Sequence, residues 1–147
     1  MIRLKTKKQN ITHIKLEEQL YLPVKRHLLS EAFSIQKEQM QFYEYKIDIY
    51  CYSHAKEQTA AVELKVSDFN KAVKQALIYQ LCSDLVFIAM PIFEANNCSK
   101  DLIKQYGIGI IGVDGKGSCT VIEDAVVSKF VRRNYKNILI AQMEETS

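Results

Sequence analysis

The chain has 147 residues, enough for one domain that buries a core without disulfides or zinc. Hydrophobic residues make up 48% of it and charged residues 25%, with few Gly and Pro, which excludes a disordered or fibrous chain and indicates a globular domain. The net charge of +3 is too small to argue by itself for a nucleic-acid partner.

Membrane and secreted proteins are also disfavoured. No apolar stretch approaches the length of a membrane span, and the charged N-terminus has no apolar run behind it that would form a signal peptide. The cysteines are far apart and form no C-x-x-C pair, which disfavours a zinc ribbon, a disulfide framework and an iron–sulfur cluster. We therefore expect no membrane partner, a cytoplasmic location and free thiols. These thiols belong to Cys51, Cys82, Cys98 and Cys119.

Basic residues gather near both ends of the chain. The N-terminal cluster is Arg3, Lys5, Lys7 and Lys8, and the C-terminal cluster is Arg132, Arg133 and Lys136. Either cluster could neutralise phosphate groups of a nucleic acid. Solvated tails are the simpler interpretation of both.

The first predicted element is an amphipathic helix over about residues 14–33. Its apolar residues recur at helical spacing, and they are Leu20, Tyr21, Val24, Leu28 and Ala32. Pro23 lies inside this pattern. Because proline costs about 3 kcal/mol in a helix interior, the helix is expected to start near Leu22 or to kink at Pro23.

A hairpin and a second helix are predicted next. Two strand-like runs over about 42–52 and 59–66 are joined by the polar stretch 53–58, so they should be antiparallel neighbours. Ser67 or Asp68 can then cap a helix over about 70–81, because a short oxygen side chain satisfies free N–H groups at a helix start.

The second half of the chain continues with strands and helices. The predicted order is a strand over 84–91, a helix over 99–106 ending at Gly107, strands over 108–113 and 119–123, and a weakly helical tail over 126–143. A helix between the second and third strands requires a crossover connection. We therefore predict one three-layer α/β domain with a mixed sheet of about five strands, its core over about 14–123.

The sequence acid-x-Lys occurs three times, whereas a chain of this composition should contain about one by chance. Glu44-Tyr45-Lys46 has no aspartate upstream, and Asp114-Gly115-Lys116 lies in a predicted tight turn. Only Glu63-Leu64-Lys65 lies within an apolar strand and has an aspartate, Asp48, on the preceding strand. This copy is therefore the one with a possible chemical role.

Strand alternation places Glu63 and Lys65 on the face opposite Val62, Leu64 and Val66, and places Asp48 opposite Ile47, Ile49 and Cys51. Two interpretations are open at this point. The charged residues could form the solvated side of a hairpin with a weak surface ion pair. Alternatively, they could converge on one metal ion.

The surrounding order of elements resembles that of the PD-(D/E)xK nuclease superfamily over about residues 17–91. Ala32-Phe33 lies where many members have Gly followed by an aromatic residue, and Ile47 replaces the proline that often precedes the aspartate. Gln75 and Tyr79 match the Q-x-x-x-Y helix of RecB-type and lambda-exonuclease-type members. The resemblance implies a restriction-endonuclease-like core. Segments 20–25 and 86–91 also resemble small, poorly characterised members of the superfamily.

The resemblance implies a metal site on the hairpin. Asp48, Glu63 and the main-chain carbonyl of Leu64 would hold Mg²⁺ or Mn²⁺, with water completing the octahedron. Lys65 would orient or deprotonate the attacking water and stabilise developing negative charge.

Three further positions are implied on the helices. Gln75 and Tyr79, one turn apart, would face the hairpin near the nucleophile or the substrate phosphate. The first helix would add an acid, for which Glu17 lies closest to the middle of the apolar stripe. Glu18 and Glu31 remain alternatives, and Glu31 is favoured if the helix starts at Pro23.

The implied activity is Mg²⁺-dependent hydrolysis of nucleic acid, with DNA as the expected substrate, in repair, recombination or restriction. Lys71 and Lys74 could follow the nucleic-acid backbone, and a homodimer would present two sites to two strands. Two alternatives stay open, because a fold does not fix a function. They are a nucleic-acid-binding module without turnover and a regulatory protein-interaction module.

Overall fold

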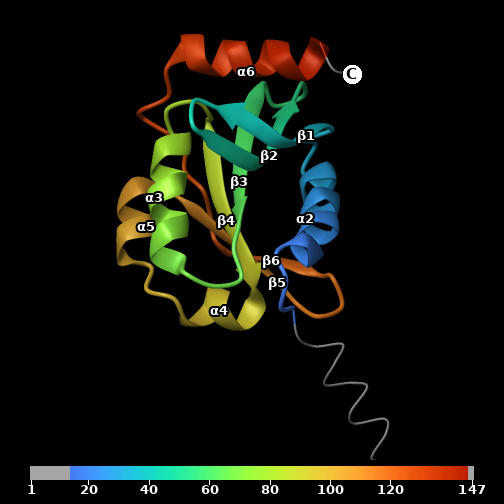
Figure 1. The fold of residues 1–147 in the computed structure, drawn as a ribbon, viewed down its shortest axis with the longest axis vertical. Coiled ribbons are helices and arrows are strands. Elements are labelled where there is room, and N and C mark those ends of the chain that lie inside the picture. The colour runs from blue at the N-terminus through green and yellow to red at the C-terminus, as the bar shows by residue number, and fades with distance from the viewer. Residues whose placement is uncertain (1–13, 146–147) are drawn as a thin grey trace, which may run out of the picture.

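The computed structural model describes residues 14–145, which form a mixed sheet with helices on both faces (Figure 1). The strands are β1 (Ile35–Phe42), β2 (Tyr45–Ser53), β3 (Gln58–Leu64), β4 (Leu85–Pro91), β5 (Gly109–Val113) and β6 (Cys119–Glu123). The helices are α2 (Glu18–Ser30), α3 (Phe69–Tyr79), α4 (Ile92–Asn97), α5 (Asp101–Tyr106) and α6 (Arg133–Glu145). The predicted α/β class is confirmed. No helix among these described residues is long and apolar enough to cross a membrane.

The strands lie in the sheet in the same order as in the chain. β1, β2 and β3 form an antiparallel meander, β3, β4 and β5 are parallel, and β6 returns antiparallel to β5. The parallel pairs need crossovers, which α3 supplies between β3 and β4, and α4 with α5 between β4 and β5. The carboxyl ends of the central strands β3 and β4 therefore lie side by side at the same end of the sheet.

The described sheet has six strands, so the expectation of about five was wrong by one. The missing strand is β1, whose sequence Ile-Gln-Lys-Glu-Gln-Met-Gln-Phe is mostly polar. It lies at the edge of the sheet, where exposed polar side chains are common and hydrophobic alternation is weak. The prediction also extended the next strand back to Phe42, which belongs to β1.

Two apolar layers hold the domain together, one on each face of the sheet. On one face α2 packs Leu20, Val24 and Leu28 against strand residues that include Ile49 and Val62. On the other face α3, α4, α5 and α6 pack against the sheet, and their buried residues include Ala76, Ile103 and Leu139. Each fully buried large apolar side chain stabilises the fold by about 1.5–3 kcal/mol.

α2 begins at Glu18 and continues through Pro23, so the predicted start near Leu22 was wrong. Pro23 has no N–H to donate to the carbonyl of Gln19. Val24 and Leu28, which follow it, are 0% and 2% exposed. Their burial offsets the lost hydrogen bond, because the helix is stabilised mainly by its packed face.

The other helix boundaries agree in part with the sequence. Asp68 caps α3 by accepting a hydrogen bond from the Lys71 N–H at 3.3 Å, and Gly107 ends α5 in the left-handed region at φ 73°. Helix α4 was missed, because it has no side-chain cap at its start and no glycine at its end, whereas the equally short α5 is marked by Gly107. Residues 126–132 are not helical, so the predicted tail helix was wrong at its start.

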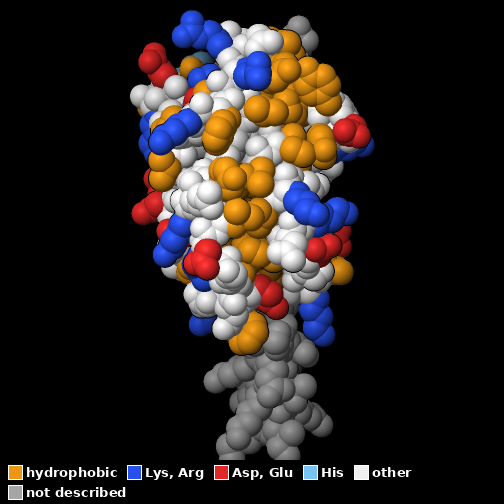
Figure 2. Space-filling model, turned by 90° about the vertical axis from the view of Figure 1, so that its left-hand side faces the viewer, with side chains coloured by type: hydrophobic (Ala, Val, Ile, Leu, Met, Phe, Trp, Pro, Cys, Tyr) orange, Lys and Arg blue, Asp and Glu red, His pale blue; other side chains and the backbone are white. Residues whose placement is uncertain are grey.

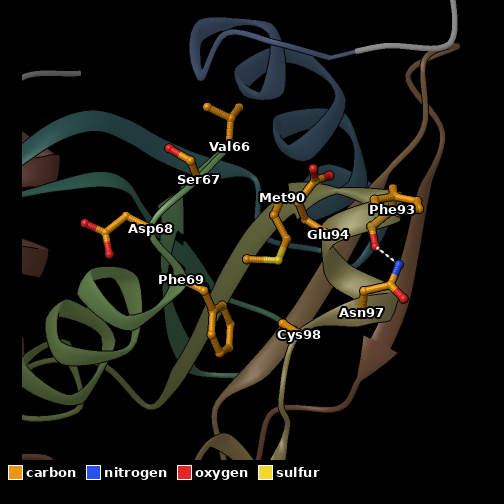
Figure 3. A pocket seen from close by; sticks show the side chains of 9 residues that line it. All are labelled: Val66, Ser67, Asp68, Phe69, Met90, Phe93, Glu94, Asn97 and Cys98. Atoms are coloured by element: carbon orange, nitrogen blue, oxygen red, sulfur yellow. Dashed lines mark hydrogen bonds between the residues drawn. The ribbon is translucent and has the colours of Figure 1, made fainter.

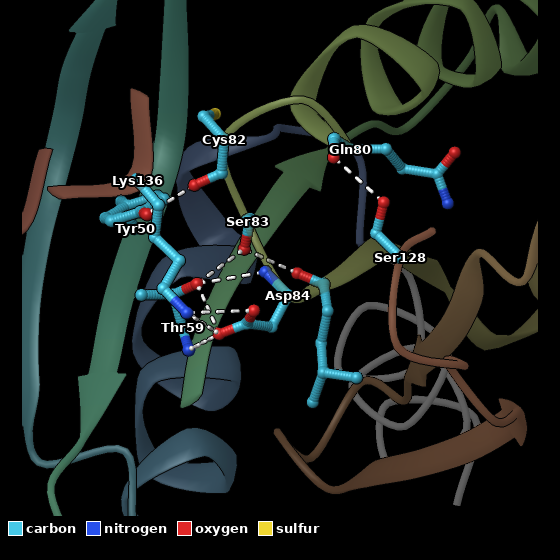
Figure 4. Close-up of polar contacts among 9 residues, drawn as sticks. Tyr50, Thr59, Gln80, Cys82, Ser83, Asp84, Ser128 and Lys136 are labelled. Carbon is cyan, nitrogen blue, oxygen red and sulfur yellow. Dashed lines mark hydrogen bonds and ion pairs between the residues drawn. The ribbon is translucent and has the colours of Figure 1, made fainter. Parts of the chain in front are cut away.

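The segment before α6 is tied to the loop before β4 by polar contacts (Figure 4). The Ser128 N–H donates to the Asp84 carbonyl at 2.7 Å, and the Arg132 N–H donates to the Leu81 carbonyl at 2.8 Å. The Asp84 carboxylate accepts from the Thr59 N–H at 2.8 Å and contacts Lys136 Nζ at 3.0 Å. These contacts fix α6 at the amino ends of β3 and β4.

Candidate active site

The site lies where the pairing of β2 with β3 ends. The register runs from Ser53↔Gln58 to Ile49↔Val62, so Asp48 and Glu63 are the next residues along the two strands. Asp48 Oδ2 accepts a hydrogen bond from the Leu64 N–H at 2.8 Å. The Asp48 carboxylate thus accepts the hydrogen bond that a main-chain carbonyl of β2 would accept if the strand pairing continued. The backbone of β3 therefore fixes the carboxylate in position.

Side-chain alternation breaks at Asp48. Ile47 packs in the core layer on the α3 side and Ile49 in the layer on the α2 side, so the prediction that they share a face was wrong. The register of β1 with β2 places Gln39 beside Asp48, and Gln39 has φ 56°. This local irregularity directs the Asp48 carboxylate toward both the Leu64 N–H and the α2 side.

Asp48 Oδ1 accepts hydrogen bonds from Gln39 Nε2 at 3.2 Å and from the Tyr21 hydroxyl at 3.3 Å. Burial raises the pKa of Asp48, and the hydrogen bond from the Leu64 N–H partly offsets this. Burial and the Asp48 charge together raise the pKa of Tyr21 to about 12. Tyr21 is therefore a hydrogen-bond donor to Asp48 at physiological pH.

Glu63 is 3% exposed, so the interpretation of Glu63 and Lys65 as a solvated surface pair was wrong. Its Oε1 lies 3.1 Å from the Tyr79 hydroxyl, which is also 3.2 Å from the Lys46 carbonyl. Burial, followed by the charge of Asp48, raises the pKa of Glu63 to about 8.

Lys65 lies between two acids. Its Nζ is 3.9 Å from Glu63 Oε2 and 4.0 Å from Glu17 Oε2, and its side chain is 14% exposed. Glu17 directly precedes α2 and is therefore the helix acid that reaches the site. Glu31 instead lies 3.7 Å from Lys56, and Glu18 makes no ion pair with Lys65 among the described residues.

The structure thus brings together most of the side chains predicted for the site. Those that meet are Glu17, Asp48, Glu63, Lys65 and Tyr79. Gln75 lies on α3 one turn before Tyr79, and its Oε1 is buried without a hydrogen-bond partner in the described part of the chain. Among residues 14–145 no hydrogen bond joins Gln75 to Asp48 or Glu63, so its role stays a prediction.

Tyr21 and Gln39 were not predicted as site residues. Tyr21 was assigned to the apolar stripe of the first helix, although it lies one helical turn after Glu17. That spacing is the sequence feature that could have identified it. Gln39 has no such feature, because its position depends on the strand β1 that the sequence pattern did not show.

The donor set fits a hard divalent cation. Burial disfavours the ionised forms of both Asp48 and Glu63, and the Asp48 charge further disfavours that of Glu63, so a cation that both carboxylates bind would stabilise their charged forms. No group of three or more His, Cys, Asp or Glu side chains among residues 14–145 is placed to hold a metal. Additional ligands would therefore have to come from the backbone, such as the Leu64 carbonyl, or from water.

Of the two basic clusters, the C-terminal one can be placed relative to this site. The N-terminal cluster lies outside the described residues. In the C-terminal cluster, Arg132 and Arg133 are exposed, and Lys136 is paired with Asp84. That cluster lies at the amino ends of β3 and β4, with α4 at the opposite end of the molecule (Figure 1).

The fold and site define an α/β domain with a cluster of acids, a lysine and tyrosines where the pairing of β2 with β3 ends. No family model and no curated protein matches the chain. A solved structure described as "SPO1766 protein of unknown function from Silicibacter pomeroyi" is similar, with a TM-score of 0.70 and 20% identity. The match covers 90% of this chain and 86% of that one, and at this identity it shows a shared fold alone.

Proposed function

We propose that this protein is a metal-dependent nuclease with a restriction-endonuclease-like core. The observation that carries the proposal is the buried Glu63, which lies beside both Asp48 and Lys65 at the end of the β2–β3 hairpin. The placement of this hairpin between α2 and the α3–β4 unit supports it, because that order resembles the PD-(D/E)xK core.

In this proposal Asp48, Glu63 and the Leu64 carbonyl hold Mg²⁺ or Mn²⁺. The ion, when bound, would lower the pKa of water and neutralise charge on the scissile phosphate. Asp48 is held for this role by the Leu64 N–H, Gln39 and Tyr21. Groups held by their neighbours before substrate arrives lose less entropy on binding.

Lys65 is proposed to orient the attacking water and to stabilise negative charge on the phosphate. Glu17 and Glu63 hold its ammonium group from two sides, and its low exposure strengthens the interaction with an incoming anion. The ammonium group is a compact point charge, whereas arginine carries a larger, planar guanidinium with a fixed set of donors, so the two are not interchangeable.

Tyr79 is proposed as a positioning residue, because its hydroxyl contacts Glu63 and the Lys46 carbonyl at the same time. The proposed substrate is a phosphodiester of nucleic acid. DNA is proposed because of the resemblance to RecB-type and lambda-exonuclease-type nucleases. The exposed Lys71 and Lys74 on α3 are proposed to contact its backbone.

The test is cleavage of single-stranded and double-stranded DNA and RNA in Mg²⁺, Mn²⁺ or EDTA. The wild type should cleave only with a divalent ion, and Lys65→Met or Glu63→Gln should lower the rate by at least about 100-fold. Lys65→Arg should be similarly impaired. The matched control is Lys104→Met, because Lys104 is exposed and its partner Glu123 lies away from the site. Cleavage that resists EDTA, or that survives both site variants, would contradict the proposal.

A nucleic-acid-binding module without turnover is the second candidate. The observation that favours it is the raised pKa of Glu63, which keeps this acid protonated near neutral pH when no cation is bound. Salt-dependent binding of DNA without cleavage in any of the divalent ions would support this candidate over the nuclease.

A further inference from the structure

A cavity of about 240 Å³ opens at the carboxyl ends of β3 and β4. Its walls include Val66 from the connection to α3, Phe69 at the start of α3, Met90 from β4, and Phe93, Glu94 and Asn97 from α4. In Figure 3, Phe69 and Met90 lie near its centre, between the 66–68 segment and α4. Open α/β sheets bind ligands outside the carboxyl ends of their parallel strands, so this is the expected edge for a ligand.

The cavity begins directly beside the candidate catalytic lysine. The Lys65 N–H donates to the Ala89 carbonyl at 3.0 Å. This hydrogen bond follows the last residue pair of β3 and β4, which is Leu64 with Ala89. The next residue on each strand, Val66 and Met90, lines the cavity. A molecule in the cavity would therefore lie about one residue beyond the point where Lys65 leaves the sheet.

The walls are suited to a flat apolar ring. Phe69, Met90 and Val66 supply an aromatic and aliphatic surface, and Phe93 is 72% exposed although it is a large hydrophobic residue. Exposed aromatic side chains beside a nucleic-acid path are typical platforms for base stacking. The volume is below the roughly 300–1,000 Å³ of pockets for drug-sized ligands, so it accommodates one ring system.

The charged groups at the rim are the carboxylates of Asp68 and Glu94, and both are acceptors. Ser67 and Asn97 can donate as well as accept, and one Nδ2–H of Asn97 donates to the Phe93 carbonyl at 2.7 Å. A phosphate would be repelled by Glu94, whereas the amino and imino groups of a base are donors. The rim therefore favours a base over a phosphate as the occupant.

We propose that this cavity receives one unpaired nucleobase of the strand that is cut. The inference rests on the proposed nuclease function and specifies its substrate class. A base within an intact duplex would first have to leave the stack, at a cost of about a few kcal/mol. The preferred substrate is then a single strand or a frayed end.

The experiment uses the full chain and short fluorescent single-stranded DNA in which an abasic nucleotide is moved one position at a time. Binding is measured with Ca²⁺ in place of Mg²⁺, with a check that the strand stays intact. For the wild type, one abasic position should weaken binding by about 10-fold, the expected effect of losing one stacked base. Phe93→Ala should remove this dependence, and its far-ultraviolet circular dichroism should match the wild type.

The matched control is Tyr43→Ala, because Tyr43 is also an exposed aromatic residue, at 68%, but packs against Tyr135 of α6. This variant should keep the single sensitive position. If the wild type cleaves DNA but binds equally well to strands with the abasic nucleotide at every position, the proposal that the cavity binds a base is overturned. The nuclease proposal is then left intact. Absence of both cleavage and binding with every nucleic acid would overturn the two proposals together.

Discussion

Tyr79 has one hydroxyl hydrogen but two acceptors within reach, the Lys46 carbonyl and Glu63. When Glu63 is protonated, its own O–H can donate to the tyrosine oxygen, and the tyrosine hydrogen is free for the carbonyl. When Glu63 is ionised, both acceptors compete for the same hydrogen. This arrangement agrees with the direction in which burial and Asp48 shift the pKa of Glu63.

Stability without metal should therefore fall as pH rises. The pKa of Glu63 is about 8 in the folded protein against an ordinary value of 4.5. Between these values the folded chain holds a proton that the unfolded chain has lost, so the free energy of unfolding decreases with pH. Glu63→Gln does not titrate, and in EDTA it should be more stable than the wild type near pH 8, by a few kcal/mol.

Urea unfolding across this pH range measures the effect. Glu38→Gln is the control, because Glu38 is an exposed acid that pairs with Lys25 at the surface. It should keep the pH slope of the wild type. An equal slope in Glu63→Gln and the wild type would contradict the prediction.

At the scale of elements, Asp84 joins three parts of the fold. Its carboxylate accepts from the N–H and hydroxyl of Thr59 at the start of β3 and pairs with Lys136 of α6. Asp84 is 7% exposed, so removing the carboxylate would leave a buried N–H and a partly buried ammonium group without their acceptor.

Asp84→Ala should lower the free energy of unfolding by about 3 kcal/mol, because it breaks a buried ion pair and two hydrogen bonds. Lys136→Met should cost less, since Asp84 keeps its contacts with Thr59. Urea unfolding is the measurement, and Lys25→Met, which breaks the exposed pair with Glu38, should cost less than about 1 kcal/mol. Equal losses in Asp84→Ala and Lys25→Met would contradict this role.

How far the sequence predicts the elements depends on how each one is stabilised. β4 was predicted because its continuous apolar run is typical of a strand buried on both faces. β1 was missed because it is an edge strand, and α4 because it is short and has neither a capping side chain nor a terminal glycine. Glu63 of β3 and Lys65 just after it were identified from the apolar run that surrounds them. Gln39 was not identified, because tertiary pairing alone brings it to Asp48.

At the scale of the whole molecule, α4 and α6 lie at opposite ends (Figure 1). Between these ends, apolar side chains form a band along the face that carries α3 and α5 (Figure 2). Leu102 of α5 is 46% exposed, and Phe130, which contacts Tyr106 of α5, is 51% exposed. Exposed apolar patches of this kind often mark interaction surfaces.

The expected homodimer should use this face. Leu102→Glu should then shift the mass measured by sedimentation equilibrium from dimer to monomer, because it would bury a charge in the interface. Leu29→Glu is the control, since Leu29 is similarly exposed at 53% but lies on α2, on the other face of the sheet. A wild type that is monomeric at all concentrations, or equal masses for the two variants, would contradict the prediction.

The hydrogen bond from Leu64 to Asp48 links the folding of the hairpin to the shape of the site. Because this carboxylate completes the pairing of two strands, its rotamer is fixed when the sheet forms. The conformational entropy of the Asp48 side chain is then lost during folding. Binding of a cation does not require that loss again, so the affinity is higher than for a mobile carboxylate. Substitutions that loosen the β2–β3 hairpin far from Asp48 should therefore weaken ligand binding along with stability.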